Sequence, residues 1–113
     1  MINNKIIGSK PELEYFKSSY NINMVRIPYE ITKLSEGVYS WKEIIVKYSN
    51  FNYGGIVSAI INMVYSNDKM TAIINNYLLD ANEESTKEFN EMQEFRSYAK
   101  STAKIITDMY NIQ

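Results

Sequence analysis

Cysteine and histidine are both absent from this chain. Without cysteine it can form no disulfide, no thiol nucleophile and no thiolate metal site. Without histidine it lacks the commonest general base near neutral pH and the commonest ligand of transition metals. We therefore expect a protein that is not an enzyme and that needs no cofactor.

The chain also lacks an excess of charge of either sign and a long apolar run. Twelve Lys and Arg residues against thirteen Asp and Glu residues leave a net charge of −1, which gives no overall attraction to nucleic acid or anionic lipid. No apolar stretch approaches the ~20 residues that span a bilayer, and the N-terminus lacks the ~7–15-residue apolar run of a secretory signal. We expect a cytoplasmic protein without a membrane partner.

What the chain does contain is the composition of a globular protein. Its 113 residues, 45% of them hydrophobic, fit one domain over residues 1–113. The patterns predict an α+β fold in which an N-terminal β-hairpin packs on a central helical pair, with a long amphipathic C-terminal helix. The predicted parts are a peripheral arm with a short helix (1–22), the hairpin (24–48), the helical pair (53–80) and the C-terminal helix (85–110).

The N-terminal arm has two weak signals. Residues 5–7 are typical of either a short strand or an ordered arm. Ser9 and Glu12 have the spacing of a capping box with Pro11 between them, which predicts a short helix over 12–19.

The hairpin is predicted from strict alternation. Val25, Ile27, Tyr29 and Ile31 alternate with polar residues or proline, as in a half-buried strand. Pro28 cannot donate to a ladder, so we expect this strand at a sheet edge. Residues 35–37 supply the turn.

The return strand has a helical competitor. Trp41, Ile44, Ile45 and Tyr48 fall on one helical face, and residues 40–43 have capping-box spacing. The β-branched run 44–46 and the preceding turn favour a strand, which is our prediction.

The central stretch 53–80 is the longest region with few charges, and it predicts two helices that are both buried in the core. Residues 66–68 interrupt the pattern and cap the second helix. Gly54 and Gly55 allow a tight approach of helix and sheet or an unusual turn. The apolar positions are Ile56, Ala59, Ile60, Met63 and Val64 in the first helix and Met70, Ile73, Ile74, Tyr77 and Leu78 in the second.

The last segment is predicted to be one long helix that begins at a capping box over 85–88. At 1.5 Å per residue it would measure ~35 Å and would project beyond a domain of this size. Its apolar stripe consists of Phe89, Met92, Phe95, Ala99, Ala103, Ile106 and Tyr110.

The sequence matches two known binding motifs in part. The helical pair has helix-turn-helix spacing, but its second helix carries one cation and is flanked by Asp68 and Asp80, so it lacks the charge for phosphate contacts. The second motif is an EF-hand calcium frame with Ser85 where the turn requires glycine, and an acidic first turn of a helix explains the same residues. Its positions 1, 3, 5, 9 and 12 are Asp80, Asn82, Glu84, Glu88 and Glu91.

Catalytic patterns are not found. The paired carboxylates lie on a predicted exposed face, which is a poor setting for general acid–base work. The chain has neither a nucleophile elbow nor a phosphate-binding glycine loop.

The most informative feature of the composition is its high content of aromatic residues. Ten tyrosines and one tryptophan exceed what a small core can enclose, and both residue types are favoured at interfaces. The alternative is that they cap the core with their hydroxyls in water. A stacking surface for single-stranded nucleic acid would need cations beside them, and the lysines and arginine of the hairpin are diluted by glutamates. Our candidate interaction surface is Tyr29, Tyr39, Trp41 and Tyr48.

Four stretches carry a resemblance: residues 65–68, 72–80, 88–96 and 99–100. Over residues 53–104 the chain resembles small uncharacterised proteins encoded by phages and prophages of gut bacteria. The resemblance implies a phage accessory or virion-associated role, in the host cytoplasm or the virion, and gives no catalytic residue. We expect a non-catalytic protein–protein interaction or assembly module that binds a protein partner or itself as a homo-oligomer. The alternative is a nucleic-acid-associated regulatory protein, with nucleic acid an unlikely partner.

Overall fold

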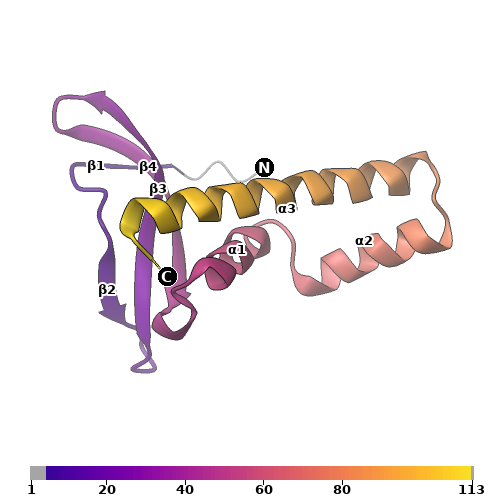
Figure 1. Ribbon diagram of the computed structural model, residues 1–113, viewed down its shortest axis with the longest axis horizontal. Coiled ribbons are helices and arrows are strands. Elements are labelled where there is room, and N and C mark those ends of the chain that lie inside the picture. The colour runs from indigo at the N-terminus through magenta and orange to yellow at the C-terminus, as the bar shows by residue number, and fades with distance from the viewer. Residues whose placement is uncertain (1–4, 113) are drawn as a thin grey trace.

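The computed structural model describes residues 5–112 and has an α+β fold, as predicted (Figure 1). Four antiparallel strands form one sheet in the order β1-β4-β3-β2. The strands are β1 (Ile6–Gly8), β2 (Glu14–Lys17), β3 (Asn23–Ser35) and β4 (Val38–Lys47). The helices are a 3-10 turn, η1 (Tyr48–Asn50), and α1 (Tyr53–Asn62), α2 (Asn67–Leu79) and α3 (Glu83–Tyr110).

The predicted hairpin is confirmed as β3 and β4. Gly37 has a φ of 74° in the turn between them. Segment 41–48 is strand as far as Lys47, so the helical alternative is wrong. The pairing slips between Tyr29 and Thr32, and Glu30 there has a φ of 51°, the left-handed region that a non-glycine residue seldom adopts. The hairpin is therefore bent in its middle.

The predicted helix over 12–19 is wrong, because β2 occupies this segment. Tyr15 pairs with Val25 and Phe16 with Met24. An isolated helix of two turns with a thin apolar face is marginal, whereas β3 offers a row of unpaired backbone groups. For residues 5–7 the strand interpretation holds: β1 pairs with the 39–41 part of β4.

Pro28 is not in an edge strand, because β3 lies between β4 and β2. The pairing with β2 ends at Arg26, however. Beyond that residue β3 has a neighbour on one side only, which is a position that proline tolerates.

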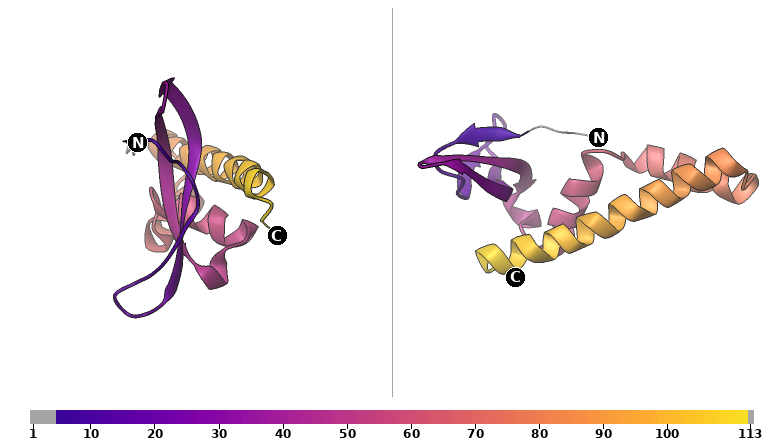
Figure 2. Two further views of the ribbon diagram at one scale, coloured as in Figure 1. Left: turned by 90° about the vertical axis from the view of Figure 1, so that its left-hand side faces the viewer. Right: turned by 90° about the horizontal axis from the view of Figure 1, so that it is seen from above.

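The core lies between one face of the sheet and the helices. Figure 1 and Figure 2 (right) show the strands at one end of the molecule and the helices on a single side of the sheet. Alternate residues of β3 and β4 point to this side and pack against α1 and the C-terminal half of α3. The buried set includes Val25, Ile27, Tyr29, Ile44, Val46, Ile56, Ile60, Ala99, Ala103 and Ile106.

The expectation that both central helices are buried is wrong for α2. Helix α1 buries three residues, whereas α2 buries only Ile73 among its residues. Figure 1 shows α2 beside α3 and beyond the end of the sheet. Its run of Asn67, Asp68 and Lys69 and its Asn75–Asn76 pair leave it too polar to be covered on several sides. The molecule is consequently elongated, with extents of 50 × 36 × 25 Å.

The helices do not begin at the predicted capping boxes. Helix α3 begins at Glu83 because the Asn82 side chain accepts the first-turn bond from the Ser85 amide. Ser85 is buried, and its hydroxyl donates to the Asp80 carbonyl at 2.6 Å. The caps of α1 and α2 are Asn52 and Ser66, so the predicted capping role of 66–68 is confirmed.

Candidate interaction surface

The four predicted surface residues do not form one surface. Tyr29 is only 2% exposed, because the alternation that buries Ile27 also points Tyr29 at the helices. Trp41 points to the opposite face and is buried against Gly8, where an added Cβ would lie 2.7 Å from the indole ring. Tyr39 is half-buried, and Tyr48 is 59% exposed. Tyr29 and Trp41 are therefore corrected to packed residues.

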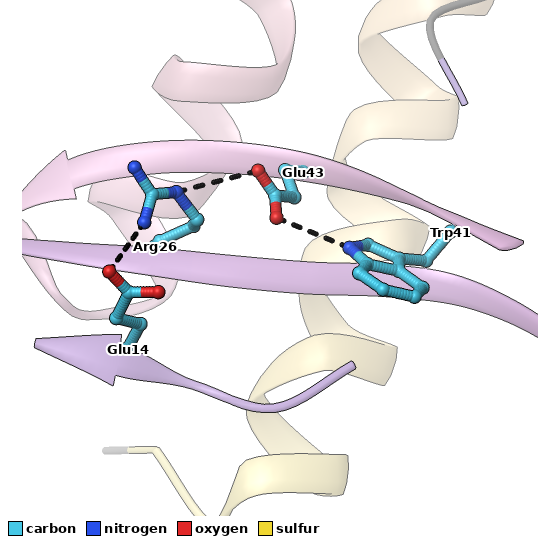
Figure 3. Close-up of polar contacts among 4 residues, drawn as sticks. All are labelled: Glu14, Arg26, Trp41 and Glu43. Carbon is cyan, nitrogen blue, oxygen red and sulfur yellow. Dashed lines mark hydrogen bonds and ion pairs between the residues drawn. The ribbon is translucent and has the colours of Figure 1, made fainter. Parts of the chain in front are cut away.

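The face of the sheet away from the helices carries an ordered polar network (Figure 3). The Arg26 guanidinium lies 2.7 Å from Glu14 and 3.5 Å from Glu43. The Trp41 indole N–H donates to Glu43 at 3.2 Å. Arg26 also lies over the Phe16 ring, 4.7 Å from its centroid. The network joins β2, β3 and β4, and it fixes the arginine instead of leaving it free for a ligand.

Two shallow hollows lie at the end of the sheet where β2 and β4 stop and β3 begins. One has a volume of about 360 Å³ and is lined by Tyr15, Phe16, Lys17, Asn23, Met24 and Tyr48. The other has a volume of about 440 Å³ and lies between residues 45–47 of β4 and α1. Met24 lines both. We call Tyr15, Lys17, Met24, Lys47 and Tyr48 the strand-end patch.

The two tyrosine rings of the strand-end patch contact each other and the ring of Phe51. Tyr15 and Tyr48 have their ring centroids 6.3 Å apart, and each lies within 6.3 Å of the Phe51 ring. Phe51 packs against the core. Each tyrosine is nevertheless 59% exposed. Aromatic pairs at such separations attract by ~0.5–1.5 kcal/mol, so two exposed rings are fixed in place without being covered.

The cations of the strand-end patch have no acidic partner among the residues that the structure describes. Lys17 and Lys47 take part in none of the ion pairs formed by residues 5–112, whereas the other cations of β3 and β4 do. Lys17 lines the same hollow as the exposed rings of Tyr15 and Tyr48, and Lys47 lines the neighbouring hollow. The register places Tyr15 and Lys17 on the helix-facing side of the sheet and Met24 and Lys47 on the other side, so the patch wraps around the end of the sheet.

A second polar cluster joins the hairpin to α3. Lys42 lies 2.7 Å from the Glu30 carboxylate, and the Tyr98 hydroxyl donates to the same carboxylate at 2.7 Å. Burial alone would raise the pKa of Glu30, but the hydrogen bonds from Lys42 and Tyr98 outweigh it and lower that pKa. The Glu30 carboxylate raises the pKa of Lys42. Glu30 and Lys42 neutralise each other, and Tyr98 links this ion pair to α3.

The acidic frame considered for calcium is not a loop. Asp80 and Asn82 lie in the connection between α2 and α3, whereas Glu84, Glu88 and Glu91 lie on successive turns of α3. Within residues 5–112 no three acidic side chains converge to hold a metal ion. In the same residues no helix has both the length and the apolar character to cross a membrane.

The sequence interpretation missed Tyr15, Lys17 and Met24. The incorrect helix over 12–19 separated Tyr15 and Lys17 from the hairpin, and Met24 precedes the alternating run. Tyr48 was identified through its aromatic character alone.

Comparison with known proteins identifies no relative: no family model, no curated protein and no solved structure matches the chain. The resemblance to phage-encoded proteins therefore stays a prediction.

Proposed function

We propose that the chain is a non-catalytic protein–protein interaction or assembly module that binds its partner through the strand-end patch. The observation that carries this proposal is the exposure of Tyr15 and Tyr48, 59% each, on rings that Phe51 anchors to the core. Exposed aromatic rings that are already ordered lose little conformational entropy on binding. Tyrosine and methionine are also enriched at protein interfaces.

Site-specific photo-crosslinking tests the proposal. A benzoylphenylalanine is incorporated in place of Tyr48, and the source cells are irradiated. The control places the same group at Ile105, which is 65% exposed on α3. We expect a defined protein adduct from position 48 and no defined adduct from position 105. Adducts of equal yield at both positions, or none at either, contradict the proposal.

The alternative function is favoured by one observation: two lysines that form no ion pair within residues 5–112 line the hollows at the strand ends, where Tyr15 and Tyr48 are exposed. Cations next to aromatic side chains are the elements of a surface that stacks single-stranded nucleic acid. A gel shift with single-stranded oligonucleotides at low salt tests it. Binding that weakens as salt rises, and that Lys47→Glu abolishes, would favour this alternative. No shift at low salt would remove it.

A phage accessory role, in the host cytoplasm or the virion, is supported only by the sequence resemblance. Mass spectrometry of particles released by the source cells tests it, and absence of the chain from both particles and infected cells would contradict it.

A further inference from the structure

The end of the molecule opposite the strand-end patch is a two-helix arm. It consists of α2 and the first half of α3, residues 66–95, and projects away from the sheet (Figures 1 and 2). Tyr77 of α2 stacks on Phe89 of α3 with ring centroids 4.2 Å apart and planes 9° from parallel. This stacking, together with the Ser85–Asp80 hydrogen bond, orders the tip of the arm.

The tip exposes two large apolar side chains. Leu78 is 74% exposed and Leu79 is 86% exposed, because α2 directs Ile73 and Tyr77 at α3 and leaves these two leucines on its solvent side. Asp80, Glu83 and Glu84 follow them directly in the chain. We call Leu78, Leu79, Asp80, Glu83 and Glu84 the arm tip.

The two ends of the molecule carry opposite charge. Residues 66–95 contain seven acidic and two basic residues, a net charge of −5. Residues 5–50 contain seven basic and five acidic residues, a net charge of +2, and two of those cations are the free lysines of the strand-end patch. The arm tip therefore combines apolar side chains with negative charge, and the patch combines apolar side chains with positive charge.

We propose that the arm tip of one copy docks on the strand-end patch of a second copy. Leu78 and Leu79 would cover Tyr15, Met24 and Tyr48, while the carboxylates of the arm tip would lie near Lys17 and Lys47. The proposal rests on the proposed function and names its partner. Charge complementarity within one chain favours a second copy over an unrelated protein.

The contact is heterologous, because the two surfaces differ. They lie at opposite ends of a molecule 50 Å long, so one copy cannot close the contact on itself. Head-to-tail contacts generate open chains, or rings where the rotation closes.

Two complementary variants test the proposal. The patch variant is Lys17→Glu with Lys47→Glu, and the arm variant is Leu78→Ser with Leu79→Ser; all four residues are exposed. Light scattering coupled to size exclusion is carried out over a range of concentrations at low salt. We expect the wild-type mass to rise above 13.2 kDa with concentration and to fall back at ~0.5 M salt, where charges are screened. Each variant alone should associate at least about tenfold more weakly.

A mixture of the patch variant and the arm variant shows whether the two surfaces bind each other. Each variant keeps one intact surface, so an equimolar mixture should form a 1:1 complex that neither variant forms alone. Ile105→Ser removes an exposed apolar side chain elsewhere and should leave association unchanged. Circular dichroism verifies that each variant is folded, and Leu78→Ala with Leu79→Ala is the milder arm variant.

Three outcomes overturn the inference: a wild-type chain that stays monomeric, variants that still associate alone, or a mixture that forms no complex. A different protein crosslinked at position 48 would overturn the second copy as partner while leaving the proposed function standing. Absence of any adduct at that position would remove the proposed function itself.

Discussion

At the scale of single residues, two adjacent glycines have different packing requirements. A Cβ at Gly55 would overlap the Asn50 carbonyl oxygen, which is backbone and has little freedom to move. A Cβ at Gly54 would meet its nearest neighbour, the Asn52 side-chain oxygen, at 3.7 Å. The glycine pair therefore marks one close approach, between the start of α1 and η1.

Gly55→Ala should lower the free energy of unfolding by about 2 kcal/mol or more, because the backbone must shift to admit the methyl group. Gly54→Ala is the matched control and should be neutral or stabilising by up to ~1 kcal/mol, since alanine favours the helix. Urea denaturation measures both. Equal effects of the two substitutions would contradict this packing.

Because Tyr29 is buried, the folded protein should lose stability at alkaline pH. Burial is the main cause that raises its pKa to about 12. Because the folded pKa lies above the unfolded one, stability is complete below pH ~10 and is lost as pH rises toward 12, at ~1.4 kcal/mol per pH unit. Burial also raises the pKa of Tyr98 and Tyr110, which adds to the loss.

Tyr29→Phe should flatten this alkaline decline, measured by urea denaturation between pH 9 and 12. The Tyr29 hydroxyl has only a 3.9 Å contact with the Met63 sulfur, so its removal should cost little at neutral pH. Tyr20→Phe, at a position 86% exposed, is the control. An unchanged decline in Tyr29→Phe would contradict the assignment.

The tyrosines differ in how far their environment follows from the sequence. The period-2 pattern that predicts the hairpin also places Tyr29 on the face of Val25 and Ile27, so its burial could have been predicted. The exposure of Tyr48 could not, because it depends on Tyr15 and Phe51, which reach it from other elements.

At the scale of elements, strands and helices were predicted best where a long periodic pattern exists. The hairpin and the extent of α3 follow from such patterns. The S-x-x-E spacing was a poor guide: of the three occurrences, one precedes β2, one lies in β4 and one lies inside α3. Asparagine caps two of the three α-helices instead. Strand β2 was missed because four residues carry no period, and its partner β3 decides its conformation.

Helix α2 should open more readily than α1, because α2 buries one residue and packs mainly on α3, whereas α1 buries three and packs on both β4 and α3. Amide hydrogen exchange measures this directly. Ile73→Ala should accelerate exchange in α2 and leave α1 unchanged, and Leu78→Ala should change neither. Equal protection of the two helices would contradict the arrangement.

At the scale of the whole molecule, the elongation distinguishes this fold from the predicted one. A compact chain of this length has a radius of gyration of about 13 Å. The observed value over the Cα atoms is 16.4 Å. Sequence reasoning anticipated that the long helix would project, but not that α2 would accompany it, since a mixed apolar and polar helix can pack on one neighbour or on several.

Small-angle X-ray scattering at low concentration and high salt should therefore give a radius of gyration of at least 16.4 Å for the monomer. A value near 13 Å would show that α2 folds back on the body, and the arm with its exposed leucines would not exist.

A lysine-acylation footprint of the strand-end patch would reveal whether a protein covers this patch in the source cells. The chain is labelled in concentrated lysate of the source cells and again as dilute purified protein, and mass spectrometry compares Lys17 and Lys47 with Lys100, an exposed lysine on α3. We expect only the two patch lysines to lose reactivity in the lysate, because a bound protein covers them. Unchanged reactivity of Lys17 and Lys47 relative to Lys100 would contradict this expectation.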